Sequence, residues 1–261
     1  MGASPSRVPK NNTYLTDPCT VDELMGTLDT GDMILFRGNS MSAWWIRWYE
    51  MCDYSHVAMV HIRTLDGDSE PTMCIWESVC HLDNLHCLLH GRVKSGPRLV
   101  SLRDKLNDYI AGSGTSREVR LCVVKLRPQP VEARMHLDQN LAGFEDHTCN
   151  RSYYPSPMGV VGSAMGVWQL PMGDDSLQRH GAAPRTDYTC EQLIACTLVK
   201  MGAYTPTLDV NKIHLKSFLD GSIPEHDRQL AVLDQINYHM IVKPPPPPAH
   251  GLIAMNIFQE V

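Results

Sequence analysis

Residues 55–62 read SHVAMVHI, and residues 72–79 read TMCIWESV. Branched and aromatic side chains dominate both runs, so we predict that each forms a β-strand. The turn-forming residues 66–68, DGD, lie between the two runs and predict an antiparallel hairpin. His56 begins the first strand, whereas Glu77 is a carboxylate inside a second strand that is otherwise mostly apolar.

A buried carboxylate such as Glu77 needs a polar partner in the fold. The distal ring nitrogen of His56 can provide it, and this hydrogen bond would fix the tautomer of the imidazole. His61 lies five residues further along the same strand, on its opposite face, and is the second candidate base.

Cys190 is the candidate nucleophile because it lies in the first turn of a predicted helix over residues 190–200. Thr189 is the predicted N-cap and Gln192 occupies the third helical position. The positive end of the helix dipole lowers the pKa of a thiol placed there, and the free N–H groups can hold an oxyanion. Cys196 lies on the other side of the helix and is predicted to be a core residue. The alternative for Cys190 is a buried structural thiol.

The remaining elements follow from apolar periodicity and from turn residues. Further strands are predicted at 33–36, 98–102 and 119–126, and helices at 21–28, 41–51, 102–110 and 131–144, whereas the segments 215–219 and 224–233 give weaker signals. The strands largely precede the helix that carries Cys190. The fold class is therefore α+β, with an antiparallel sheet packed against that helix.

In the helix at 41–51, Trp44, Trp45 and Trp48 recur at helical spacing. We predict that this aromatic face packs inward. The alternative is an aromatic ledge that contacts a substrate, with Trp44 and Trp48 as the candidate binding residues.

The domain organisation follows from composition along the chain. Residues 1–20 are polar and predict a flexible arm, and residues 21–240 form the single main domain. Residues 145–187, rich in Gly, Pro, Tyr and Met, predict a long insertion that could line a site. Residues 241–261 form a proline-rich tail.

Overall composition excludes several classes of function. The formal net charge of the 261 residues is −6, so neither nucleic acid nor an anionic membrane is an expected partner. No apolar run is long enough to span a bilayer, and the first ten residues lack the apolar core of a signal peptide. Nine irregularly spaced cysteines then favour free thiols in a reducing compartment. These features predict a cytoplasmic protein.

A metal or cofactor is not expected. Cys74, His81, His86 and Cys87 lie close together in the sequence, but their spacing matches no zinc motif. A zinc protein built on this cluster is retained as the last alternative.

Two short motifs suggest partners outside the main domain. Gly2 followed by Ser6 fits the pattern for N-myristoylation, which would give a reversible peripheral membrane contact. Pro244–Pro248 form an extended polyproline segment that could dock a proline-binding domain.

Four motifs in this order resemble the circularly permuted branch of the NlpC-type papain-like superfamily. These motifs are TGDMILFRG at 30–38, SHVAMV at 55–60, WES at 76–78 and YTCEQLI at 188–194. The branch includes YiiX-like bacterial proteins, a poxvirus-encoded group and enzymes similar to lecithin retinol acyltransferase. A glutamate in the third position is more similar to the first two groups.

The resemblance implies a permuted papain-like fold and a Cys190–His56–Glu77 triad that forms an acyl-enzyme. It also implies an oxyanion site at the Cys190 amide, to which Tyr54 or Tyr188 could contribute. The substrate would be a peptide, an amide or a lipid acyl ester, cleaved by water. The alternatives are acyl transfer to another acceptor, as in a lipid-modifying enzyme, and a non-catalytic interaction module.

Overall fold

The computed structural model describes residues 19–79, 83–112, 119–126, 131–151, 188–220, 223 and 233–243. A seven-stranded sheet forms its centre, in the order β1-β9-β8-β2-β3-β4-β7. The strands are β1 (Cys19–Thr20), β2 (Met33–Phe36), β3 (His56–Arg63), β4 (Thr72–Val79), β7 (Gly96–Ser101), β8 (Val119–Leu126) and β9 (Leu233–Lys243). All neighbouring strands of this sheet are antiparallel except β1 and β9. The short strands β5 (His86–Cys87) and β6 (Arg92–Val93) form a separate pair.

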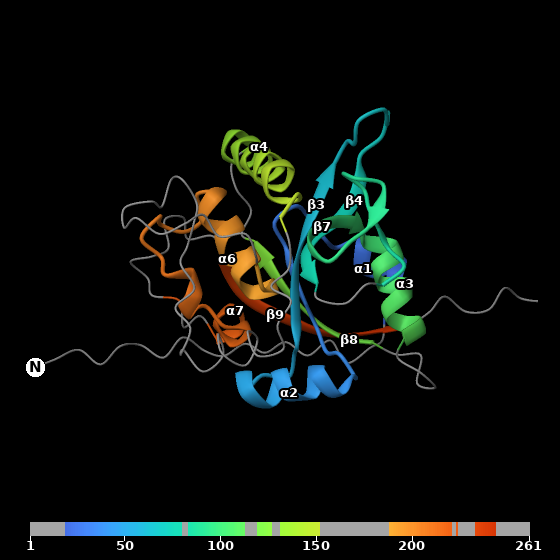
Figure 1. Ribbon diagram of the computed structural model, residues 1–261, viewed down its shortest axis with the longest axis vertical. Helices are drawn as coiled ribbons and strands as arrows, with labels where there is room; N and C mark the ends of the chain where they lie inside the picture. The colour runs from blue at the N-terminus through green and yellow to red at the C-terminus, as the bar shows by residue number, and fades with distance from the viewer. Residues whose placement is uncertain are drawn as a thin grey trace, which may run out of the picture.

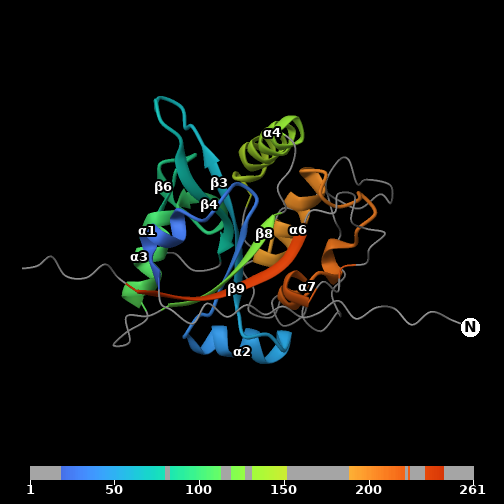
Figure 2. The same ribbon diagram turned by 180° about the vertical axis from the view of Figure 1, so that it is seen from behind.

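Helices cover both faces of the sheet (Figures 1 and 2). One face packs against α1 (Val21–Met25) and α3 (Leu102–Gly112), and the other against α4 (Val131–Thr148) and α6 (Cys190–Lys200). Alternate residues of β3 supply the two cores: Val57 and Met59 face α6, whereas Ala58 and Val60 face α3. The short helix α7 (Leu215–Asp220) lies on the α6 side. The structure is therefore an antiparallel-rich α+β fold with two apolar cores.

The helix ends match their sequence signals. Thr20 and Glu23 form a reciprocal capping box at the start of α1, with hydrogen bonds of 2.7 and 3.2 Å. Helix α2 (Met41–Glu50) begins at Ser40, whose hydroxyl accepts a hydrogen bond from the Ala43 amide (3.1 Å). It ends at Met51, which adopts a left-handed conformation with φ of 46°.

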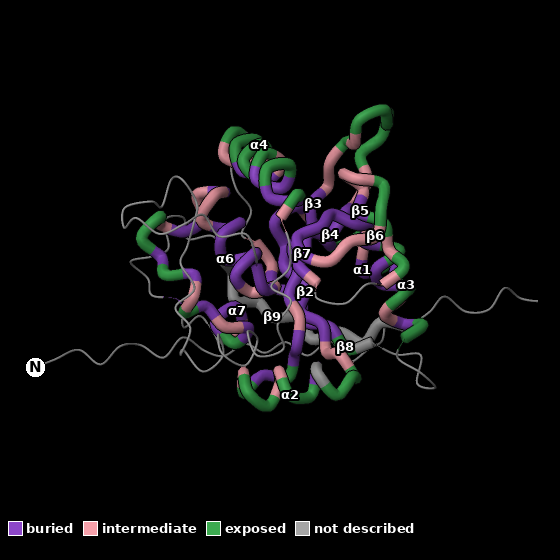
Figure 3. The backbone as a smooth tube through the Cα atoms, in the orientation of Figure 1, coloured by how far each residue is buried: buried purple, intermediate pink, exposed green. Residues whose placement is uncertain are grey.

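The prediction that the tryptophan face of α2 packs inward is wrong. The side chains of Trp44, Trp45 and Trp48 are exposed, and α2 lies beyond the end of the sheet. Ala43 and Ile46 take the inward positions instead. Figure 3 shows the contrast between the mostly exposed α2 and the largely buried α6.

Other boundaries also differ from those predicted. Helix α4 extends to Thr148, so the predicted insertion at 145–187 overlaps a helix at its start. Strand β9 was not predicted, and its residues 241–243 had been placed in the tail. Cys19 and Thr20, predicted as part of the flexible arm, pair with β9.

Several predictions lie outside the described residues. These concern Gly2, His81, Pro244–Pro248 and residues 152–187 of the insertion. Within the part of the chain that the structure describes, no helix combines the length and apolarity that a membrane crossing requires.

Asp32 ties the start of β2 to the end of β8. Its buried carboxylate accepts hydrogen bonds from the backbone amides of Asp29 (2.8 Å) and Leu126 (3.0 Å) and pairs with the ammonium group of Lys125 (2.5 Å). Loss of this acceptor leaves backbone donors unpaired where water has little access.

We therefore expect Asp32→Ala to lower the free energy of unfolding by about 3 kcal/mol. The measurement is urea denaturation followed by circular dichroism. Asp66→Ala, at the exposed turn between β3 and β4, is the control and should change stability by less than about 0.5 kcal/mol. Equal losses in the two variants would contradict this role for Asp32.

Candidate active site

The site forms where β3 and β4 stop pairing with each other. Their register runs from Arg63 opposite Thr72 to Met59 opposite Trp76, although β3 begins at His56 and β4 continues to Val79. We call this region, residues 56–58 of β3 and 77–79 of β4, the β3–β4 fork. Both of its arms remain paired on their outer sides, to β2 and β7.

The N-terminus of α6 reaches both arms of the fork. The hydroxyl of Ser78 donates a hydrogen bond to the carbonyl oxygen of Tyr188 (2.7 Å). The backbone amide of Val57 hydrogen-bonds to the thiol of Cys190. Because Val57 directly follows His56, the sulfur lies beside the first residue of β3.

His56 and Glu77 meet across the fork. His56 Nε2 lies 2.8 Å from Glu77 Oε2, which confirms the hydrogen bond predicted from the sequence. The imidazole is also supported by the ring of Phe36, whose centroid is 5.8 Å away. An ionised Glu77 can only accept, so the proton of the neutral imidazole resides on Nε2 and Nδ1 is the basic nitrogen.

Three charged side chains surround the buried carboxylate of Glu77. Arg98, directly opposite on β7, donates to Oε1 from Nη2 (2.7 Å) and Nε (3.1 Å), and Lys105 Nζ lies 2.8 Å from the same oxygen. Asp83 binds both cations. Burial raises the pKa of Glu77, but Lys105, the His56 bond and Arg98 outweigh it and hold that pKa well below its usual value. Glu77 is therefore a carboxylate at neutral pH.

The thiol of Cys190 is in a less activating environment than the sequence predicts. Burial raises the pKa of Cys190 well above its usual value, and the negative charge of Glu191 raises it further. The thiol donates to Glu191 Oε2 (3.1 Å), and not to His56, within the described chain. The predicted lowering of the pKa by the helix terminus is therefore wrong, because burial and the adjacent carboxylate outweigh the dipole. Cys190 is protonated in the resting structure.

Tyr109 of α3 is a site residue that the sequence did not indicate. Its ring packs 4.8 Å from that of Phe36. Burial first, and then the charge of Glu77, raises the pKa of Tyr109, and a thiolate at Cys190 would raise it further. The hydroxyl is therefore a neutral donor close to the reacting groups.

Gly38 makes room for this arrangement. A Cβ atom at this position would lie 2.9 Å from Ser55 Oγ and 3.3 Å from the Tyr109 hydroxyl. Ser55 Oγ in turn accepts a hydrogen bond from the Gly38 amide (3.0 Å). Because Gly38 has no side chain, the backbone that follows β2 can pass close to Ser55 and Tyr109.

The remaining candidate residues lie in different surroundings. Tyr54 is buried, and its side chain hydrogen-bonds to the thiol of Cys122 on β8. Tyr188 is buried and meets Ser78 through its main chain, whereas Trp44 and Trp48 are exposed on α2. The oxyanion role of Tyr54 and Tyr188 stays a prediction.

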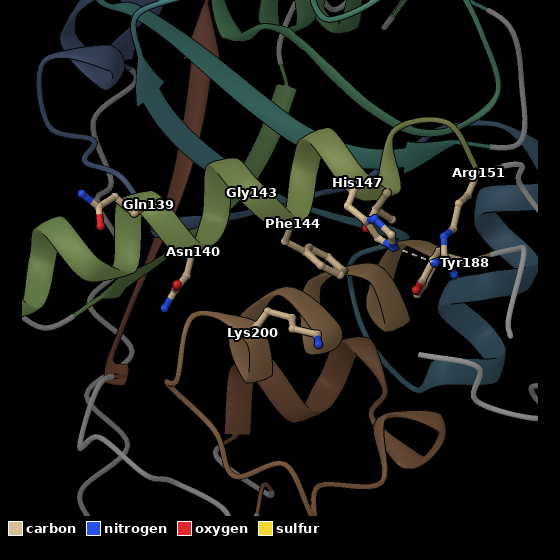
Figure 4. A pocket seen from close by; sticks show the side chains of 9 residues that line it. Gln139, Asn140, Gly143, Phe144, His147, Arg151, Tyr188 and Lys200 are labelled. Atoms are coloured by element: carbon tan, nitrogen blue, oxygen red, sulfur yellow. Dashed lines mark hydrogen bonds between the residues drawn. The ribbon is translucent and has the colours of Figure 1, made fainter. Parts of the chain in front are cut away.

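A pocket of about 340 Å³ lies between α4 and α6 (Figure 4). Its lining is about equally polar and apolar, and the polar residues include Gln139, Asn140, His147, Arg151, Tyr188 and Lys200. The side chains of His147 and Arg151 are hydrogen-bonded at 3.0 Å. None of Cys190, His56 and Glu77 lines the pocket, so it is separate from the candidate active site.

His61, the second candidate base, and the cysteines of the zinc alternative make contacts with other elements of the fold. His61 is buried against α4, with Nδ1 2.9 Å from both carboxylate oxygens of Glu145. Cys74 donates to the Thr72 carbonyl, and Cys87 lies 3.3 Å from Cys149, sulfur to sulfur. No metal-binding group of three or more ligands occurs within the described ranges.

We expect Lys105→Met to lower the free energy of unfolding by about 3 kcal/mol, because it removes one of the cations that offset the buried charge of Glu77. Arg103→Met is the matched control on α3, since Arg103 pairs with Asp22 at the exposed surface and should contribute less than about 1 kcal/mol. Chemical denaturation at pH 7 measures both. Similar values for the two variants would show that Glu77 does not need Lys105.

Glu191→Gln should lower the pKa of the Cys190 thiol, because it removes the adjacent negative charge that raises this pKa. The alkylation rate of Cys190 by iodoacetamide, followed against pH by peptide mass spectrometry, would then rise at lower pH than in the wild-type protein. Alkylation of Cys19, remote from Glu191 in the fold, is the internal control. An unchanged profile at Cys190 would eliminate Glu191 as a cause.

No family model matches the chain, and no curated protein matches its sequence. Among solved structures, the crystal structure of metalloprotein yiiX from Escherichia coli O157:H7 (DUF1105) is similar at a TM-score of 0.34 and 16% identity. The similarity covers 79% of this chain and 89% of that one.

Proposed function

We propose that this chain is a thiol-dependent hydrolase of an amide, peptide or ester acyl bond. Cys190 is the nucleophile, His56 the general base and Glu77 the residue that orients the base. The observation that carries the proposal is the pairing of His56 with Glu77 at the fork: Glu77 holds Nε2 of His56 at 2.8 Å, and the backbone amide of the adjacent Val57 contacts the Cys190 sulfur. Nucleophilic catalysis uses a thiol beside an imidazole that a carboxylate orients; because the resting thiol donates to Glu191, it must turn from Glu191 to His56 before it attacks.

The chemistry begins from the protonated thiol of Cys190 and requires the unprotonated form of the His56 imidazole. Nδ1 of His56 accepts the thiol proton as sulfur attacks the acyl carbonyl carbon, and Glu77 stabilises the imidazolium that results. The backbone amide of Cys190 and the hydroxyl of Tyr109 are the donors we assign to the oxyanion.

The tetrahedral intermediate collapses when His56 returns the proton to the leaving amine or alcohol, which leaves a thioester on Cys190. Water then attacks this thioester while His56 accepts a proton from the water molecule. The second intermediate expels the Cys190 sulfur, which regains its proton, and the carboxylic acid is released.

A permuted papain-like arrangement belongs to this proposal. It is supported by the chain order, with the base on β3, its orienting carboxylate on β4 and the nucleophile at the start of the later helix α6. The same order of motifs carries the resemblance to the permuted NlpC-type superfamily described above.

The alternatives differ in what they require of the site. Acyl transfer uses the same thioester and differs only in replacing water with another acceptor. A non-catalytic interaction module would have no use for a buried Glu77 held by Arg98 and Lys105, because burying this set of charges is costly. The buried charges that hold Glu77 beside His56 therefore favour the catalytic proposal over the interaction module.

Reaction with 4-nitrophenyl acetate tests the proposal. We expect a burst of 4-nitrophenolate and an acetyl group on Cys190, located by peptide mass spectrometry. Cys190→Ser should abolish the acetylation at this position, and His56→Ala should slow the burst by about 10²–10⁴-fold. Glu77→Gln should slow it by at least about 10²-fold, because the tautomer is no longer fixed.

His86→Ala is the control because this histidine is exposed on β5, and its burst should equal that of the wild-type protein. Circular dichroism of every variant separates loss of chemistry from loss of fold. Acetylation spread over several cysteines, or a burst that survives His56→Ala in a folded protein, would refute the triad.

A further inference from the structure

Helix α2 turns its large apolar side chains toward solvent. Met41 and Met51 are each 79% exposed, and Trp44, Trp45 and Trp48 are 50%, 55% and 66% exposed. At spacings of three, four, seven and ten residues from Met41, these side chains follow one face of the helix and its C-terminal residue. The usual amphipathic pattern, with the apolar stripe facing the core, is reversed.

The tryptophans form a continuous surface. The ring centroids of Trp44 and Trp45 are 4.9 Å apart and those of Trp45 and Trp48 are 5.9 Å apart, both in edge-to-face geometry. Large apolar side chains gathered in this way on a protein surface mark an interaction site. The neighbouring Tyr49 is also exposed and enlarges the aromatic content.

The charged groups of α2 are directed away from this surface. Glu50, the acidic residue of the helix, has an almost fully buried side chain that pairs with His214 Nδ1 (3.3 Å) and accepts from the Leu215 amide (3.1 Å). Arg47 donates to the Gly38 carbonyl. The exposed stripe thus carries no ionised side chain among the described residues of α2.

We propose that the exposed face of α2, comprising Met41, Trp44, Trp45, Trp48 and Met51, binds the interface of a phospholipid bilayer. Tryptophan and tyrosine are enriched at the level of lipid headgroups, where one part of the ring is apolar and its N–H or O–H is hydrated. A helix of ten residues is about 15 Å long, which is too short to span a bilayer but suits one that lies in its plane.

The shape of the surface favours lipid over a protein partner. In both views α2 lies beyond the end of the sheet and forms an outer edge of the described residues (Figures 1 and 2). A fluid bilayer adapts to such an edge, whereas an aromatic anchor in a protein complex needs a matching pocket on the partner. The net charge of −6 also indicates that apolar insertion, rather than attraction to anionic lipids, supplies the binding.

Binding through α2 would place the fork at the membrane surface. The chain runs from Met51 at the end of α2 directly to His56 at the start of β3, and Glu50 connects the inner side of α2 to His214. This surface acts without a lipid anchor on Gly2, and it does not rest on the thiol chemistry proposed above.

Co-flotation of the full chain with phosphatidylcholine vesicles tests the surface. We expect the Gly2→Ala protein, which cannot be myristoylated, to float with the vesicles. Replacing Trp44, Trp45 and Trp48 together by Ser in that background should lower the partition coefficient at least about 10-fold. Met135→Ser, which removes an exposed apolar side chain from α4, is the matched control and should leave flotation unchanged.

Quenching of tryptophan fluorescence by brominated phosphatidylcholine gives a second readout. In a Trp168→Phe background, emission from α2 should be quenched, and this quenching should disappear in the triple variant, because the one tryptophan that remains, Trp76, is buried and bonded to Thr197. Circular dichroism establishes that the triple variant is folded. Cys190→Ser should bind vesicles like its parent, so failure of the catalytic proposal is distinguishable from failure of this one.

Three results would overturn the proposal. The first is the absence of flotation by the Gly2→Ala protein. The second is flotation that the triple variant retains. The third is self-association in solution that the triple variant abolishes while vesicles bind neither protein, which would identify a second copy of the chain as the occupant of the surface.

Discussion

Where β3 and β4 cease to pair, the backbone of each arm of the fork loses its partner across the ladder. The Val57 amide on one arm and the Ser78 hydroxyl on the other are taken up by the start of α6, at Cys190 and Tyr188. A buried backbone donor without a partner costs free energy, and the start of α6 supplies the partner that the interrupted sheet lacks. The thiol consequently reaches the sheet beside His56, and the rest of the site is organised around that position.

The same fork requires a buried charge. Glu77 faces α3 from an otherwise apolar strand, and its carboxylate would be unfavourable there without Arg98 and Lys105. Each cation is in turn bound by Asp83, so the cluster of four side chains is electrically balanced. Balanced buried charges contribute little net stability, but they hold Glu77 in one position and one ionisation state. A fixed acceptor at Nε2 is what an orienting group for His56 must provide.

Much of the fold follows from local sequence, and the site follows only in part. Strands 33–36, 72–79 and 119–126 and the helix at 190–200 were predicted with the bounds observed, because alternation, turn residues and caps act over a few residues. The His56–Glu77 bond was predicted because one hairpin contains both residues. Arg98 and Lys105 were missed because their approach to Glu77 depends on the register of β7 and the docking of α3.

The missed features share a dependence on tertiary context. Strand β9 completes the sheet by pairing with β8, far from it in sequence, and nothing in its own residues marked that partner. The outward face of α2 has the periodicity of a packed helix, so spacing alone could not distinguish its direction. Periodicity identifies a face, whereas the neighbouring elements decide which way that face points.

The pKa of Glu77 is lowered and the pKa of Cys190 is raised. Glu77 is held ionised, whereas Cys190 is held protonated by burial and by Glu191. Under the proposed mechanism the thiolate forms only as the thiol proton moves to His56. Since the thiolate is the form that oxidants and stray electrophiles attack, a protonated resting state would protect the sulfur of the proposed hydrolase between turnovers. Under that proposal, activation is confined to the moment when an acyl group lies against the fork and expels water, which strengthens the attraction between thiolate and imidazolium.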